Sequence, residues 1–130
     1  MTTQTALDLR TATIGQIAIP VHDLARSTAF YRDSLGLPLL FEVDGHMSFF
    51  DCGGVRLMLS LPEAEFDHRA SVVYFRVSDL DAVYEALKTR GVVFRGTPHK
   101  VADMGSYELW MAFFEDAEGT VLALMSERPK

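Results

Sequence analysis

Glu108 and Trp110 are the side chains best suited to a small-molecule site. They alternate along an apolar stretch, so a β-strand would place both on one face. A lone carboxylate in an aromatic-lined cleft can bind a cationic or hydroxyl group or act as a general base. An indole can stack on a planar ligand. The alternatives are a solvated strand end for Glu108 and a place in the core for Trp110.

Histidine is the other residue type here that could move a proton near neutral pH. His46 follows a turn glycine, and His99 lies in a long loop of the second half of the chain. Each is a candidate catalytic base, with an exposed surface histidine as the alternative. Cys52 neighbours two glycines and has no adjacent His or Lys, so we do not expect a nucleophilic thiol.

Composition excludes several classes of partner. The 130 residues suit one domain, with 12 basic and 18 acidic side chains and a formal net charge of −6. Nucleic acid is not an expected partner without a basic stripe, and no apolar run approaches the length of a membrane helix. The single Cys52 excludes an internal disulfide and favours a cytoplasmic location.

The elements that must position these residues follow from hydrophobic periodicity. Asp23 and Asp79 each predict the N-cap of a helix. The predicted strands cover 14–21, 38–43, 47–51, 55–61, 72–77, 92–94, 108–115 and 120–125. Residues 97–106 are predicted to be a loop, and the polar connection 62–70 a hinge. The predicted order is therefore β-α-β-β-β, twice.

An internal repeat supports this order. Val21 and Val77 lie 56 residues apart in similar strand-to-helix phrases, and the glycines that end the two helices are 55 apart. The segments 54–59 and 119–124 correspond at an offset of 65. Two copies of one motif predict a pseudo-symmetric sheet structure with a site where the copies meet.

Four phrases resemble the vicinal oxygen chelate superfamily, which includes glyoxalases, bleomycin resistance proteins and dioxygenases. They are IAIPVHDL (17–24), FYRDSLGL (30–37), VSDL (77–80) and FFEDAEG (113–119). The resemblance implies an α+β fold in which two βαβββ modules form curled mixed sheets around a cavity, with helices on the outer face. It predicts a flexible lead-in over 1–12 and one domain over 13–127, with modules at about 13–61 and 71–127.

Metal-dependent members of this family take ligands from four strand positions, which correspond here to Gln16, Met58, Val72 and Ala123. Val72 and Ala123 have no donor atom, and Met58 offers a thioether suited to copper(I) rather than to a harder ion. Gln16 alone could coordinate such an ion. We therefore expect no metal at the usual site and no cofactor.

Strand alternation predicts which side chains line the cavity. The expected ligand-binding residues are Gln16, Ser48, Met58, Tyr74, Glu108 and Trp110. In the outer hairpins, His46, Ser48, Phe50, Ala112 and Phe114 are expected on the cavity side, and Met47, Phe49, Leu109, Met111 and Phe113 under the helices. The opposite face of the inner strands is expected to pack under the helices through Ile17, Ile19, Leu57, Leu59, Val73, Phe75, Leu122 and Leu124.

Three functions remain open on this sequence. The first is metal-free binding of a small aromatic or amphipathic molecule in the cavity. The second is a lyase, epimerase or dioxygenase of the same superfamily, with relocated catalytic groups such as Glu108, His46 or His99, or a non-standard metal site. The third is an interaction module that acts only through dimerisation. The resemblance also implies a homodimer, and leaves open whether modules are exchanged between subunits.

Overall fold

The first module is a four-stranded mixed sheet with a helix on one side. The computed structural model describes residues 7–62 and 69–130, so most of the predicted hinge and half of the predicted lead-in lie outside it. The elements are β1 (Gln16–Pro20), α1 (Leu24–Ala29), η1 (Phe30–Ser34), β2 (Leu39–Val43), β3 (Met47–Cys52) and β4 (Val55–Ser60). The strand order is β1-β4-β3-β2, and only β1 and β4 pair in parallel.

The second module repeats this plan with a divided edge strand. Its elements are β5 (Tyr74–Arg76), α2 (Leu80–Thr89), β6 (Val93–Phe94), β7 (His99–Asp103), β8 (Tyr107–Glu115) and β9 (Val121–Pro129). The order is β5-β9-β8-β6, and β7 also pairs with β8. The predicted loop at 97–106 is therefore wrong in part, because it contains β7. A register shift between Lys100 and Ala102 breaks the alternation that would have marked this strand.

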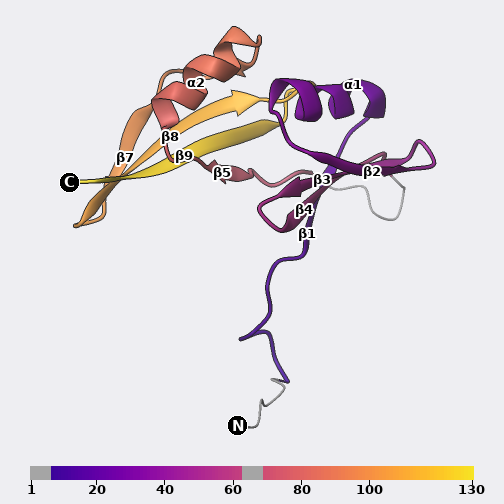
Figure 1. Ribbon diagram of the computed structural model, residues 1–130, viewed down its shortest axis with the longest axis horizontal. Coiled ribbons are helices and arrows are strands. Elements are labelled where there is room, and N and C mark those ends of the chain that lie inside the picture. Colours follow the sequence, from indigo (N-terminus) through magenta and orange to yellow (C-terminus); the bar gives the residue numbers. More distant parts are fainter. Residues whose placement is uncertain (1–6, 63–68) are drawn as a thin grey trace.

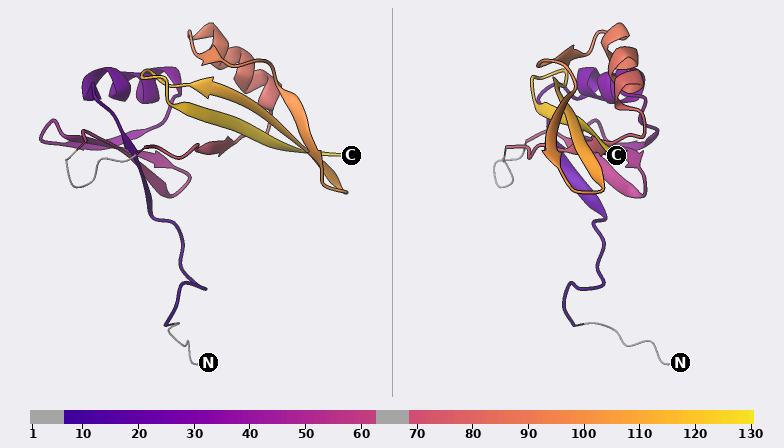
Figure 2. Two further views of the ribbon diagram at one scale, coloured as in Figure 1. Left: turned by 180° about the vertical axis from the view of Figure 1, so that it is seen from behind. Right: turned by 90° about the vertical axis from the view of Figure 1, so that its left-hand side faces the viewer.

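Both helices cover the same side of the molecule, and the other side of each sheet is free of helices (Figure 1, Figure 2). The predicted N-caps are confirmed: the Asp23 and Asp79 carboxylates accept hydrogen bonds from the backbone N–H groups of Arg26 and Ala82, respectively. The α+β class and the two βαβββ modules are likewise confirmed. Strand pairing in the described residues leaves the two sheets separate, so a single chain does not join them into one continuous sheet.

The core lies between the helices and the sheets. The predicted helix-facing residues of the inner strands are confirmed, since all eight belong to the core cluster or pack against it. Tyr31, Phe50 and Phe114 are the largest fully buried side chains. Phe50 and Phe114 come from the outer hairpins, where the predicted faces are wrong.

The turns explain this error. The two-residue turn at Gly53 and Gly54 pairs Cys52 with Val55, so Phe50 stands opposite Leu57. Directly opposed residues share a face, which places Phe50 with Leu57 under the helices. In the second module, Phe114 stands opposite Leu122 in the same way. The cavity and core lists of both outer hairpins are therefore exchanged relative to the prediction.

The two modules are joined by the hairpin between β8 and β9, which contacts the first helix. The buried Asp116 accepts a 2.7 Å hydrogen bond from the Tyr31 hydroxyl, and its other oxygen accepts the backbone N–H groups of Glu118 and Thr120, both at 2.9 Å. Burial and the Asp116 carboxylate raise the pKa of Tyr31, so this phenol remains a donor at neutral pH.

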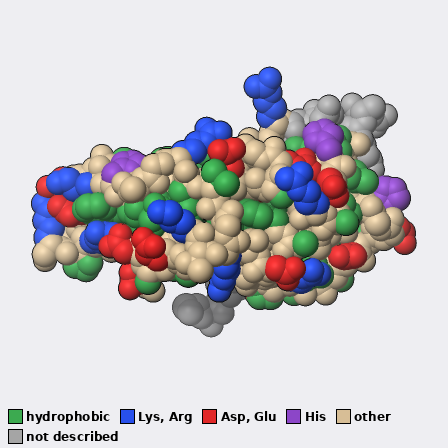
Figure 3. All heavy atoms as spheres, turned by 90° about the horizontal axis from the view of Figure 1, so that it is seen from above, with side chains coloured by type: hydrophobic (Ala, Val, Ile, Leu, Met, Phe, Trp, Pro, Cys, Tyr) green, Lys and Arg blue, Asp and Glu red, His purple; other side chains and the backbone are tan. Residues whose placement is uncertain are grey.

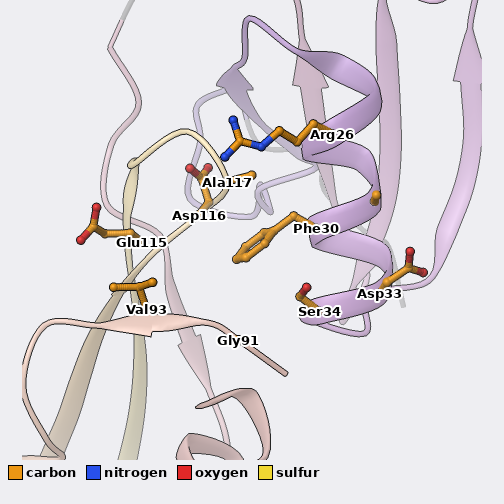
Figure 4. Close-up of a pocket in the computed structure, with 10 residues that line it drawn as sticks. Arg26, Phe30, Asp33, Ser34, Gly91, Val93, Glu115, Asp116 and Ala117 are labelled. Carbon is orange, nitrogen blue, oxygen red and sulfur yellow. The ribbon is translucent and has the colours of Figure 1, made fainter. Parts of the chain in front are cut away.

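Glu118 makes the second contact of this junction. Its carboxylate accepts the backbone N–H groups of His22 and Asp23, the latter at 2.7 Å, and the Ser27 hydroxyl at 3.2 Å. We call Asp116 and Glu118 together the hairpin clamp. Beside it lies a cleft of about 440 Å³ between the first helix and the hairpin, into which Phe30 points (Figure 4).

Candidate functional site

The helix-free face of the first sheet, here the first open face, is mainly apolar. Phe41 and Phe49 stack at a centroid distance of 4.6 Å, and the Arg56 guanidinium lies 5.6 Å from the Phe49 ring. Phe41 is 45% exposed, which is high for an aromatic side chain in a sheet. The face comprises Gln16, Ala18, Pro20, Phe41, Val43, Met47, Phe49, Asp51, Arg56, Met58 and Ser60.

The helix-free face of the second sheet, the second open face, has a similar character. Tyr74 is 44% exposed and meets Phe113 edge to face at 6.0 Å. The His99 ring stacks against Phe113 at 6.3 Å. The face comprises Tyr74, Arg76, Val93, His99, Leu109, Met111, Phe113, Glu115, Val121, Ala123, Met125 and Glu127.

Three of the six predicted ligand-binding residues lie on these faces, and three lie on the opposite side of the sheets. Gln16, Met58 and Tyr74 are on the open faces, as expected. The predicted position of Ser48 is wrong: it is fully buried under α1, where its hydroxyl lies 2.7 Å from that of Thr28. A buried hydroxyl needs such a partner, so this pair attaches α1 to β3.

Glu108 and Trp110 also lie on the helix-bearing side, since they stand opposite Arg128 and Ser126 in β9. The Arg128 guanidinium covers the Trp110 ring at 4.0 Å, and it also pairs with Asp81 of α2 at 3.1 Å. The Trp110 indole N–H donates to Glu108 at 3.2 Å. Trp110 thus packs against the core and contacts groups of its own chain, which is the alternative to stacking on a planar ligand.

The same contacts affect the basicity of Glu108. The Trp110 hydrogen bond, together with Lys100 at 3.5 Å, holds the pKa of Glu108 below its ordinary value despite some desolvation. A carboxylate with a lowered pKa is a weaker general base at neutral pH. The contacts of Glu108 with Trp110 and Lys100 therefore favour a structural role over that of a general base.

The two candidate histidines are far apart in the fold. His46 is exposed at the turn between β2 and β3, and its Nδ1 lies 2.6 Å from the Asp44 carbonyl oxygen. His99 is on the second open face, opposite Met111, and its Nδ1 lies 3.0 Å from the Thr97 carbonyl oxygen. No ion pair or hydrogen bond in the described residues connects either ring to Glu108.

The four strand positions that the family resemblance assigns to metal ligands do not fit a divalent ion here. Gln16 donates its side-chain N–H to the Met58 sulfur at 3.5 Å, so these two side chains contact each other on the first sheet. Ala123 is fully buried and Val72 is 41% exposed, and neither has a donor atom. Among the described residues, no group of three His, Cys, Asp or Glu side chains could hold an ion.

A cleft of about 810 Å³ adjoins both open faces at the junction of the modules. Its apolar lining includes Pro20 from the first open face, Val121 from the second, and Val72 from the segment just before β5. Its polar side includes His22 and Glu118 of the junction. Exposed aromatic rings on both open faces, Phe41 and Tyr74, therefore accompany a cleft at the junction of the two modules.

Comparison with known proteins identifies the fold family. Residues 13–124 match the model of the Glyoxalase/Bleomycin resistance protein/Dioxygenase superfamily. The chain belongs to this superfamily. The resemblance found in the four sequence phrases is thus confirmed.

Proteins similar to this chain include an uncharacterized protein and two named as enzymes. The chain is 28% identical to the uncharacterized protein YraH of Bacillus subtilis (strain 168) over 123 residues, which cover 84% of this chain and 94% of YraH. It is 32% identical to metallothiol transferase FosB of Staphylococcus epidermidis over 119 residues, covering 85% and 81%. Lactoylglutathione lyase from Agrobacterium tumefaciens shares the fold with a TM-score of 0.73 at 20% identity, covering 90% and 95%.

On the side of the two helices, acidic and basic side chains are interspersed around a stripe of hydrophobic ones (Figure 3). In the described part of the chain, none of the helices is long and apolar enough to span a bilayer.

The turn register would have revealed the open-face residues that sequence reasoning missed. Phe49 stands opposite Met58, and Phe113 opposite Ala123, so each shares a face with a predicted cavity position. Counting back from the two-residue turn would have found Phe49.

Proposed function

We propose that this protein binds a small aromatic or amphipathic organic molecule between its open faces, without a divalent metal at the four superfamily positions. The observation that carries this proposal is the exposure of Phe41 and Tyr74 on mainly apolar, helix-free faces. Contiguous exposed apolar surface in a globular protein marks a binding site for a ligand or another protein. Methionine and aromatic side chains adapt well to flat apolar ligands.

A homodimer completes this proposal. The two open faces belong to separate sheets of one chain, and a second copy could bring the first face of one subunit opposite the second face of the other. A molecule held between two such faces loses more apolar contact with water than one on a single sheet.

Light scattering on the purified protein tests the dimer. We expect a mass twice the 14.5 kDa of the chain at micromolar concentration. A folded monomer under these conditions would contradict the dimer and leave each open face exposed. If the protein is a dimer, distances between spin labels on the two sheets would show whether the subunits exchange modules.

A thermal-shift screen with aromatic antibiotics and acyl thioesters tests ligand binding. We expect at least one compound to raise the melting temperature equally with and without a chelator, because binding of the ligand to the folded state adds to stability. Calorimetry should then show binding at least tenfold weaker in Tyr74→Ala and Phe41→Ala, which remove open-face rings. Leu9→Ala, which truncates an exposed apolar side chain of the N-terminal segment, is the matched control and should not weaken binding.

A uniformly unresponsive screen, or binding lost in the chelator, would count against this function. The enzymatic alternative is less favoured, because His46 lies in the first module, and His99 and Glu108 lie on opposite faces of the second sheet. The name of FosB indicates a metallothiol transferase, and the positions that correspond to superfamily metal ligands do not support such a reaction in this chain.

A further inference from the structure

One row of side chains crosses the second open face with an unusual set of donor atoms. His99 in β7 stands opposite Met111 in β8, and Met111 stands opposite Met125 in β9. Directly opposed residues of neighbouring strands have Cβ atoms about 5 Å apart and share a face. One imidazole and two thioethers therefore occupy adjacent places on three adjacent strands.

His99 is prepared for coordination through one ring nitrogen. Its Nδ1 lies 3.0 Å from the Thr97 carbonyl oxygen, which can accept but cannot donate a hydrogen bond. The proton is therefore on Nδ1, and Nε2 keeps its lone pair in the neutral ring. This arrangement, in which one nitrogen donates to a backbone carbonyl, is the usual support of a metal-binding histidine. Stacking on Phe113 further orients the ring over the sheet.

The thioethers of this row differ from that of Met58. The Met58 sulfur accepts a hydrogen bond from Gln16, whereas those of Met111 and Met125 accept none in the described part of the chain. Both side chains are half-buried, and unbranched methionine side chains can rearrange to meet a ligand above the sheet. The next residue along the row, Arg76, forms an exposed ion pair with Glu127 at 3.1 Å.

We propose that His99, Met111 and Met125 bind one soft monovalent metal ion of the copper(I) class. Thioether and imidazole ligands select such ions over zinc, manganese or magnesium, and a neutral donor set suits a single positive charge. The site is new relative to the four superfamily positions. It lies one row along the face from Ala123, at a separation of about 6.7 Å for two strand residues. The proposal does not depend on an organic ligand.

Silver(I) is the probe, because it is a soft monovalent ion that is stable in air. Titrations use the full chain with Cys52→Ser, since a free thiol would bind silver by itself. We expect one equivalent to bind, and Met111→Leu, Met125→Leu and His99→Gln each to weaken binding at least tenfold. Met58→Leu and Met104→Leu, which remove thioethers outside the row, should change affinity less than twofold.

A second measurement needs no substitution in the row. With labelled methionine methyl groups, silver should shift the Met111 and Met125 signals and leave that of Met58 unchanged. No binding in the Cys52→Ser protein, equal weakening by the control variants, or shifts confined to other methionines would each overturn the proposal. Copper(I) under anaerobic conditions should reproduce the silver result, and its failure to bind would also count against the site.

Discussion

Asp116→Asn is expected to lower the free energy of unfolding by about 3 kcal/mol, because hydrogen bonds to a buried charged group contribute about 1.5–3 kcal/mol each. The Asp116 carboxylate accepts three donors, one from Tyr31 and two from backbone N–H groups. In asparagine one of the two carboxylate oxygens becomes an NH2 group, which cannot accept a hydrogen bond. Either the Tyr31 hydroxyl or the N–H groups of Glu118 and Thr120 would then lose their acceptor. Urea unfolding at neutral pH measures the change.

The internal repeat supplies the control. Asp51 occupies the equivalent place in the first module, 65 residues earlier, and its side chain accepts one backbone N–H, from Gly54 at 3.2 Å. Asp51→Asn should therefore cost less than about 1 kcal/mol. Equal losses in the two variants would show that the Asp116 contact with Tyr31 does not join the modules.

Glu118→Gln is expected to lower the free energy of unfolding by about 2 kcal/mol at neutral pH, since charge-assisted hydrogen bonds become neutral ones. Burial acts to raise the pKa of Glu118, but the N–H groups of Asp23 and His22 and the Ser27 hydroxyl hold it below its ordinary value. A lowered folded-state pKa means that the stabilisation is present above the ordinary glutamate pKa. It is lost as pH falls through the folded-state value.

The difference between wild type and Glu118→Gln should therefore shrink as pH is lowered from 7 through about 4. Urea unfolding across this range measures it. Glu115→Gln is the matched control in the same hairpin, because Glu115 makes a solvent-exposed ion pair with Arg95 at 3.4 Å. Exposed pairs contribute at most about 1 kcal/mol. A pH-independent difference for Glu118→Gln would contradict the role of its charge.

The clamp is an asymmetry within the repeat. The residue that corresponds to Glu118 in the first module is Gly53, which has no side chain to reach the second helix. Only the second hairpin therefore holds the N-terminus of the opposite module's helix by a carboxylate. The acidic residues of the phrase FFEDAEG (113–119) therefore have a structural role, which is to attach the second hairpin to the first helix.

Sequence alone determined the features that depend on neighbours along the chain. The aspartates that cap both helices, the glycines that end them and the apolar alternation of the inner strands are local signals, and they predicted the two modules correctly. The absence of donor atoms at Val72 and Ala123 is equally a property of residue type. Whether a residue can coordinate a metal follows from its type, so the sequence is enough to answer that question at a known strand position.

Tertiary structure decided which side of the sheet each outer strand presents. Phe50 and Phe114 went to the core, and Phe49 and Phe113 to the open faces, because pairing across the turns fixes facing and a shift of one residue reverses it. The contact of Tyr31 with Asp116 and the row of His99 and Met111 join residues from different elements. Such contacts depend on how separate elements pack, which periodicity within one element does not specify.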